Sequence, residues 1–164
     1  MPAQLHQVLD AIFRFAAAGS QRQVIAVPRA VAQQLPLVEN LAVVSITAPE
    51  KEQAALAPFE HVLRLSFADI DFLSNDMSQR SKAKLKDAFT AEQAREVITF
   101  INKLPATIAT IVVHCEGGYS RSCAIAKALH HIYGYEVRRE DLKEMNPSVL
   151  AVMLKVAMEK QKAP

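Results

Sequence analysis

Apolar runs at four places along the chain predict strands. Residues 24–27, 41–46 and 108–113 are continuously or almost continuously apolar, which is typical of strands covered on both faces of a sheet. Residues 61–67, with the sequence HVLRLSF, alternate between apolar and polar positions and predict a fourth strand.

Helical spacing of apolar positions appears before and after the first of these strands. Residues 4–18 predict a helix that ends at Gly19-Ser20, and a second helix is expected near 29–35. Residues 11–18 are apolar enough to raise the question of a signal peptide. Charged residues interrupt the run and no basic segment precedes it, so an amphipathic helix is the favoured interpretation.

Helix signals also flank the last apolar run. Thr90 and Gln93 have the spacing of a capping box, and a further helix is expected from near Ser122. Asn146-Pro147 predicts the start of a last helix, because asparagine suits the cap and proline the first turn. The helix after Thr90 has an apolar stripe at Val97, Ile98 and Ile101.

Strands that alternate with helices indicate an α/β fold: a single-domain sandwich with a central, largely parallel sheet flanked by helices.

Composition limits the classes of function. A chain of 164 residues that is 51% hydrophobic suits one domain, 1–164, with residues 1–20 as an N-terminal helical extension. A net charge of +2 is too weakly basic to predict nucleic-acid binding, and no apolar run approaches the ~20 residues that span a membrane. Two cysteines do not make a disulfide framework, so we expect a reducing, cytoplasmic location.

The strongest chemical signal lies in residues 114–122, HCEGGYSRS, between the last predicted strand and a helix. A strand, a tight loop and a helix turn a row of backbone N–H groups toward one anion. Cys115 lies in this row, where the helix start and the aligned amides stabilise the nucleophilic thiolate. Arg121, six positions on, has a planar fork that matches two oxygens of a tetrahedral oxyanion. One short loop therefore carries a nucleophile and an anion clamp.

Neighbouring residues suit the same chemistry. Gly117 and Gly118 allow a close backbone approach, and Ser122 is placed to hydrogen-bond the sulfur. His114 is expected to organise the loop through a ring N–H, and a positive charge on it would favour the thiolate. The competing interpretation is a glycine-containing turn with a buried cysteine. The predicted phosphate-binding segment comprises Glu116, Gly117, Gly118, Tyr119, Ser120 and Arg121.

The loop resembles that of the cysteine-dependent protein phosphatases, most closely the small dual-specificity group and related bacterial tyrosine-phosphatase-like proteins. HCEGGYSRS matches the HCxxGxSRS signature of that group at each specified position. The resemblance implies a two-step mechanism without metal or cofactor. Cys115 would attack phosphorus, Arg121 would bind the equatorial oxygens, and an upstream aspartate would protonate the leaving oxygen and then activate water. It also implies that Asn146 buttresses the loop.

Three carboxylates upstream of the loop are candidates for the general acid. Asp69 comes just after the strand at 61–67 and matches the position of the acid in dual-specificity phosphatases, so we favour it over Asp71 and over Asp76. Related bacterial sequences carry FDDI where this chain has FADI. Asp69 lies 46 residues before Cys115, farther than in the small eukaryotic members. The extra length contains the basic stretch 74–89, which is interpreted either as a lid over an anionic substrate or as a solvated segment.

The expected substrate is a phosphorylated protein or a small phosphate monoester, with no nucleic-acid or membrane partner. The loop lacks the lysine that phosphoinositide-directed relatives carry, which favours phosphotyrosine or phosphoserine/threonine. Tyr119 would either stack on a substrate ring or simply be exposed, and Glu116 would disfavour polyanions. Cys123 is interpreted as a core residue rather than a redox partner of Cys115. Two other functions stay open: a catalytically inactive phosphate-binding module and a sulfurtransferase.

Overall fold

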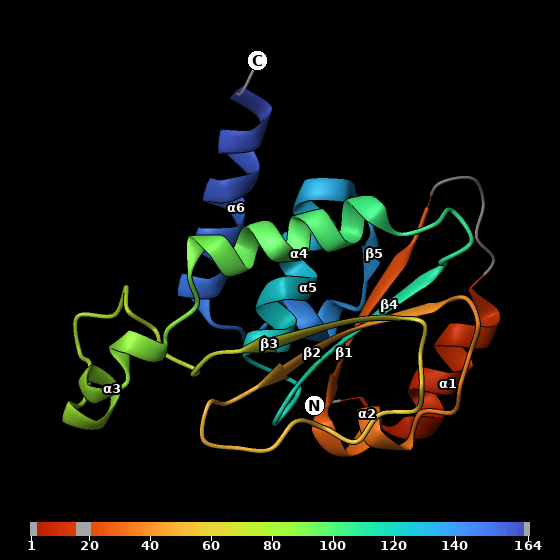
Figure 1. The fold of residues 1–164 in the computed structure, drawn as a ribbon, viewed down its shortest axis with the longest axis horizontal. Helices are drawn as coiled ribbons and strands as arrows, with labels where there is room; N and C mark the ends of the chain where they lie inside the picture. The colour runs from red at the N-terminus through yellow and green to blue at the C-terminus, as the bar shows by residue number, and fades with distance from the viewer. Residues whose placement is uncertain (1–2, 16–20, 163–164) are drawn as a thin grey trace.

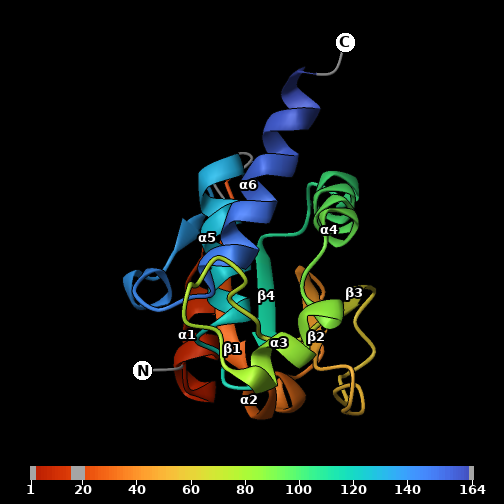
Figure 2. The same ribbon diagram turned by 90° about the vertical axis from the view of Figure 1, so that its left-hand side faces the viewer.

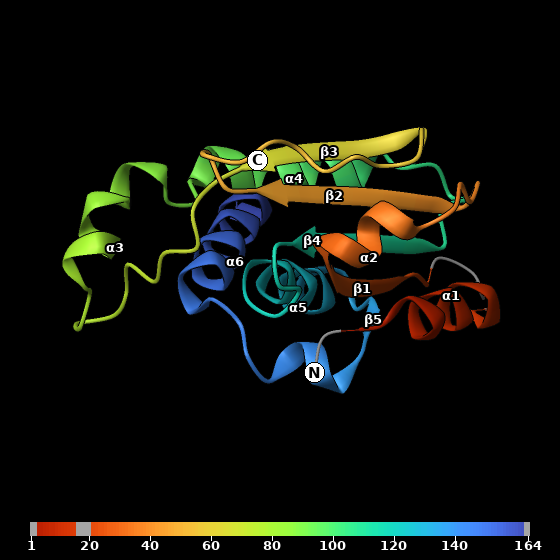
Figure 3. The same cartoon turned by 90° about the horizontal axis from the view of Figure 1, so that it is seen from below.

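A five-stranded sheet with the strand order β3-β2-β4-β1-β5 forms the centre of the molecule (Figure 3). The computed structural model describes residues 3–15 and 21–162. Every pair of neighbouring strands is parallel, which confirms the predicted fold class. The strands are β1 (Gln23–Pro28), β2 (Leu41–Thr47), β3 (His61–Ser66), β4 (Thr110–Cys115) and β5 (Glu136–Val137).

The four predicted strands are all present, with small shifts of their ends. β4 begins two residues later than the apolar run and continues to Cys115. It lies between β1 and β2, and Cys115 is paired with Pro28 at the last position of β1. Carboxyl ends of parallel strands meet at one edge of the sheet, where ligands of such folds usually bind. Cys115, the last residue of the central strand β4, therefore lies at that edge. The short edge strand β5 was not predicted.

Helices cover both faces of the sheet (Figures 1 and 2). One apolar core joins β-strand side chains to α1 (Leu5–Arg14) and α2 (Arg29–Gln34). A larger core on the other face joins the sheet to α4 (Ala91–Lys103), α5 (Arg121–Tyr133) and α6 (Pro147–Lys162). The predicted first helix is confirmed over 5–14, while 16–18 and the predicted stop at 19–20 lie outside the described residues.

The helix caps read from the sequence are present. Thr90 and Gln93 form the reciprocal capping box of α4, and the predicted apolar stripe of that helix is buried. The Asn146 side-chain oxygen accepts hydrogen bonds from the backbone N–H groups of Ser148 (2.9 Å) and Val149 (3.2 Å) at the start of α6. These caps satisfy backbone donors that helix geometry leaves free.

The segment between β3 and α4 stands away from the sheet (Figures 1 and 3). It contains the short helix α3 (Gln79–Ala83) and the 3-10 turn η1 (Leu85–Asp87). The Ala68 N–H donates to the Asp87 carbonyl at 2.7 Å, which returns the chain to the end of β3. Among the helices of the described residues, none has the length and apolar character needed to cross a membrane.

Candidate active site

Cys115 lies at the end of β4 with only 2% of its surface exposed, and two neighbouring groups contact its sulfur. The Gly118 N–H donates to Cys115 Sγ at 3.3 Å. Sγ and Ser122 Oγ are 3.1 Å apart. The thiol donates to the hydroxyl in this contact, and the direction reverses when the sulfur is a thiolate. A backbone amide and a hydroxyl are therefore in place to stabilise the negative sulfur, as the sequence predicted.

Both the backbone conformation and the neighbouring atoms require glycine at position 118. The φ of +75° at Gly118 is one that residues with a side chain rarely adopt. A Cβ at this position would lie 2.3 Å from the Pro28 nitrogen and 2.5 Å from the Val27 carbonyl carbon. The loop thus packs directly on the end of β1. That contact holds the N–H of Gly118 toward the sulfur.

We expect Gly118→Ala to remove both activity and several kcal/mol of stability, about 1 kcal/mol of it from the left-handed backbone. Gly134 is a matched control, because its φ is +74° but a Cβ there meets no atom within 4 Å. Gly134→Ala should cost only the backbone part and leave activity unchanged. Thermal unfolding of both variants measures the difference. Equal stability losses would mean that the contact with β1 is unimportant.

Arg121 is the first residue of α5, and its side chain is buried at 7% exposure. One terminal nitrogen, Nη1, donates to the Phe67 carbonyl at 2.9 Å and so ties the guanidinium to the end of β3. Within the described part of the chain, Nε of Arg121 is buried and has no hydrogen-bond partner. A buried cationic donor without a partner is unfavourable unless an anion accepts from it. Nη1 thus fixes the position of the side chain, and Nε can donate to a bound anion.

The structure brings Asp69, and neither of the other two candidate carboxylates, to Arg121. Asp69 Oδ1 accepts hydrogen bonds from the Ser120 hydroxyl and from the Asn146 amide, each at 2.8 Å. Asp71 instead accepts from the Ser148 hydroxyl at 2.7 Å, and Asp76 is exposed on the projecting segment. The geometry therefore agrees with the sequence preference for Asp69, although the catalytic role itself is a proposal.

Asp69 and Arg121 line one cavity of about 190 Å³. Glu116 points its carboxylate toward Lys51 (3.3 Å) and Arg29 (3.9 Å), while Lys84 pairs with Glu50 at 3.7 Å. These pairs are largely exposed and contribute little to stability. Both signs of charge therefore surround the cavity. Its lining residues are Ala48, Glu50, Lys51, Ala68, Asp69, Lys84, Glu116 and Arg121.

The basic stretch 74–89 contributes one charged residue to this cavity. Lys84 lines it, whereas Arg80, Lys82 and Lys86 are exposed elsewhere on the segment. The stretch is thus mainly solvated, with a single contact at the site. Sequence reasoning did not find Lys51 or Glu50, which lie in a polar loop after β2 that has no distinctive motif.

The expectation of a positive His114 is wrong. The ring is completely buried, and burial lowers its pKa to about 4, despite the opposing effect of its hydrogen bond to the Cys115 carbonyl. His114 is therefore neutral near neutral pH and cannot supply a positive field to the sulfur. Its Nε2 lies 2.6 Å from Ser45 Oγ, a partner that the sequence did not identify. The only signal for Ser45 was a polar residue inside an apolar strand.

The remaining predicted residues lie around the loop. The Asn146 N–H donates to the Ser120 carbonyl at 3.2 Å, so Asn146 connects α6, the loop and Asp69. Cys123 is buried in the core of α5, and burial raises the pKa of its thiol to about 12. Tyr119 is 54% exposed at the loop surface. Among the described residues, no cluster of three or more His, Cys, Asp or Glu side chains is arranged to hold a metal ion.

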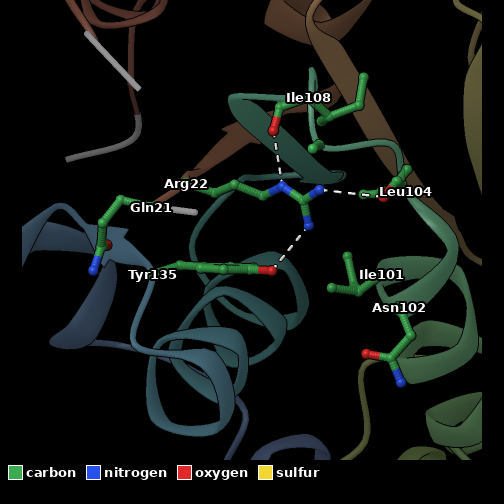
Figure 4. A pocket seen from close by; sticks show the side chains of 8 residues that line it. Gln21, Arg22, Ile101, Asn102, Leu104, Ile108 and Tyr135 are labelled. Carbon is green, nitrogen blue, oxygen red and sulfur yellow. Dashed lines mark hydrogen bonds between the residues drawn. The ribbon is translucent and has the colours of Figure 1, made fainter. Parts of the chain in front are cut away.

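A second cavity, of about 320 Å³, lies near the start of β1 and is lined by Arg22 and Tyr135 (Figure 4). Its Arg22 guanidinium donates to the Ile108 carbonyl (2.8 Å), the Pro105 carbonyl (2.9 Å) and the Tyr135 hydroxyl (3.0 Å). The charged group is thus engaged in joining β1 to the end of α4. We interpret it as structural.

No protein-family model matches the chain, and no curated protein matches it. The solved structures that are similar to the chain include two of one protein. The crystal structure of PTPMT1 has a TM-score of 0.45 and 18% identity, covering 87% of this chain and 99% of that one. The crystal structure of PTPMT1 in complex with PI(5)P has a TM-score of 0.47 and 17% identity, covering 87% and 97%. At these identities and TM-scores, neither assigns a substrate or a role to any residue.

Proposed function

We propose that residues 1–164 form one cysteine-dependent phosphatase domain that hydrolyses phosphate monoesters. The observation that carries the proposal is the buried Arg121 Nε, which has no hydrogen-bond partner among residues 3–15 and 21–162. It lies beside a loop that directs an amide and a hydroxyl to Cys115 Sγ. A nucleophile and an unsatisfied cationic donor on one loop suit a tetrahedral dianion. A steady-state assay with p-nitrophenyl phosphate tests this function directly.

In the proposed first step, the Cys115 thiolate attacks phosphorus in line with the leaving oxygen. The loop amides and Nε of Arg121 bind the equatorial oxygens of the phosphoryl group. These oxygens share the negative charge of the transition state. Asp69 donates its proton to the leaving oxygen, so that an alcohol or phenol departs. The product is a phosphocysteine and an ionised Asp69.

In the proposed second step, the Asp69 carboxylate takes a proton from water as the water attacks the phosphocysteine. Phosphate leaves, the sulfur departs as a thiolate, and Asp69 is protonated again. Ser122 Oγ, 3.1 Å from the sulfur, donates to the departing thiolate. Two hydrogen bonds to Oδ1 hold the Asp69 carboxylate in a fixed orientation through both steps.

We further propose phosphorylated protein side chains as the substrate class. The loop has no lysine, and Glu116 lies at the cavity, which disfavours polyanionic ligands. Lys51 and Lys84 also line the cavity, but each faces a glutamate. A panel of phosphotyrosine and phosphoserine peptides, phosphoinositides and nucleotides tests this choice. Preferential hydrolysis of phosphoinositides would overturn the protein substrate while leaving the phosphatase chemistry.

Two other functions predict different results in such assays. A catalytically inactive binding module would bind phosphate without turnover, so measurable steady-state hydrolysis excludes it. A sulfurtransferase would transfer sulfur from thiosulfate to cyanide through a persulfide on Cys115. Thiosulfate is also a tetrahedral dianion, so the position of Arg121 does not separate this function from a phosphatase. A thiosulfate–cyanide assay does separate them, and sulfur transfer without phosphate ester hydrolysis would favour the sulfurtransferase.

Hydrogen peroxide should inactivate the enzyme reversibly, because the thiolate form of cysteine is oxidised to sulfenic acid. A thiol reductant should restore activity, and bound phosphate should slow the loss by covering the sulfur. Cys123→Ser should be inactivated at the same rate, because the raised pKa of the buried Cys123 keeps that thiol protonated. The time course of residual activity measures this. Slower inactivation of Cys123→Ser would mean that the second thiol takes part.

A further inference from the structure

A row of polar side chains crosses three neighbouring strands one position before the proposed nucleophile. Ser45 of β2 is paired in register with Arg64 of β3 on one side and with His114 of β4 on the other. Ser45 and His114 are completely buried. On the same face, the apolar side chains of Val43 and Val112 lie two residues earlier along β2 and β4. Buried polar groups in such a place need defined hydrogen-bond partners.

One direction of the hydrogen bonds satisfies every polar group of this row. Arg64 Nη1 lies 3.2 Å from Ser45 Oγ and 2.8 Å from the Ala54 carbonyl oxygen, and a guanidinium can only donate, so Ser45 Oγ accepts from Arg64. The hydroxyl could also accept from His114 Nε2 at 2.6 Å, but its own buried proton would then have no acceptor among the described residues. The Ser45 proton is therefore assigned to His114 Nε2. An Nε2 that accepts carries no proton. The proton of the neutral ring is then on Nδ1.

The Nδ1 atom faces the nucleophile's own backbone. It lies 3.4 Å from the Cys115 carbonyl oxygen, within reach of a long hydrogen bond. With the proton on Nδ1 this contact is attractive, and with the proton on Nε2 two lone pairs would face each other. We propose that Arg64 and Ser45 are positioning residues that hold His114 as its Nδ1–H tautomer, so that the ring donates to the Cys115 carbonyl and fixes the first peptide of the phosphate-binding loop.

The proposal rests on the proposed function only in treating Cys115 as the nucleophile. The peptide that follows Cys115 leads to Gly118, whose N–H donates to the sulfur, so its orientation affects how well that amide stabilises the thiolate. The charged groups that act on His114 are Arg64 from β3, Arg29 from α2 and Glu116 from the loop. Arg64 is the one of these that donates to Ser45.

Nitrogen NMR of the histidine rings in the intact protein tests the proposal without any substrate. The chain has five histidines, and His114→Gln identifies the resonances of His114 by their loss. In the parent, Nδ1 should have the shift of a protonated nitrogen and Nε2 that of an acceptor. A parent spectrum with the proton on Nε2 would overturn the proposal by itself, whether or not any variant folds.

Arg64→Met removes the donor and keeps a similar length of side chain. Without this donor the Ser45 hydroxyl is no longer held in one orientation, so Nε2 should become protonated in part of the population. Alkylation of Cys115 by iodoacetamide at neutral pH should slow roughly three- to tenfold, the effect of about one hydrogen bond. Arg64→Lys, which keeps a donor, should restore both readouts at least partly. An unchanged tautomer and alkylation rate in Arg64→Met would overturn the positioning role.

Arg29→Met tests whether Arg64 acts on the His114 tautomer through its hydrogen bond to Ser45 or through its charge. It removes a positive charge that also acts on His114, but Arg29 is not hydrogen-bonded to Ser45 in the structure. Its ring spectrum should keep the Nδ1–H tautomer, and a tautomer change equal to that of Arg64→Met would assign the effect to charge. Absence of phosphatase activity in a parent that shows the expected tautomer would contradict the proposed function and leave this inference standing.

Discussion

Cys115→Ser is expected to abolish hydrolysis of p-nitrophenyl phosphate, by a factor on the order of 10⁴ or more, as loss of a covalent nucleophile does elsewhere. A serine hydroxyl is hardly ionised at neutral pH and attacks phosphorus poorly without a base. The Gly118 N–H, the Ser122 hydroxyl and the buried Arg121 all remain, so binding of a phosphate mimic should persist. Steady-state kinetics measure the first effect, and calorimetric titration with tungstate measures the second.

Cys123→Ser is the matched control for this change. It makes the same replacement eight residues further on, at a thiol that is buried and lies 3.5 Å from the Gly118 carbonyl oxygen. A serine hydroxyl can donate to the same carbonyl, so this variant should retain most of the activity. Activity of Cys115→Ser within tenfold of the parent would rule out covalent catalysis by this residue.

The structure of residues 108–122 was predictable because its parts are contiguous in sequence. An apolar strand, two glycines and a helix start within 108–122 are enough to place Cys115 and Arg121 on one loop. The sequence also predicted the contact between Ser122 and the sulfur, which depends on the same local turn. No knowledge of distant strands was needed.

The position of Asp69 depended on tertiary structure. The sequence favoured Asp69 but left Asp71 and Asp76 as alternatives, since all three follow β3 within a few residues. The surroundings of Asp69 became known only from the structure: Ser120 of the loop and Asn146 before α6 both donate to its Oδ1. These contacts join segments that are 51 and 77 residues apart in sequence.

The state of His114 could not be predicted for a related reason. A histidine beside a reactive cysteine suggests a positive charge, and only burial and strand register show otherwise. Ser45 reaches the ring because β2 lies next to β4, although β3 follows β2 in the chain. Strand order of this kind is not contained in the apolar pattern of any single segment.

Asp69→Asn should slow phenyl phosphate hydrolysis by roughly 10² to 10⁴, the range of general acid catalysis, and p-nitrophenyl phosphate much less. Phenoxide is a basic leaving group that needs a proton, whereas p-nitrophenolate is stable without one. Asparagine keeps an acceptor oxygen for Ser120 and Asn146, so the variant loses the proton donor while the hydrogen bonds that orient the side chain remain. Rates measured with both substrates give the leaving-group sensitivity.

Asp71→Asn tests whether the effect belongs to Asp69 itself or to any carboxylate of the same segment. Asp71 is two residues away, but its carboxylate accepts from Ser148 rather than lining the cavity with Arg121. This variant should keep the leaving-group sensitivity of the parent, whereas Asp69→Asn should increase that sensitivity, because Asp69 is the proposed proton donor to the leaving oxygen. If Asp71→Asn increases the sensitivity and Asp69→Asn does not, the hydrogen bonds to Asp69 serve the loop alone, and the acid reaches the substrate only after residues 69–71 rearrange.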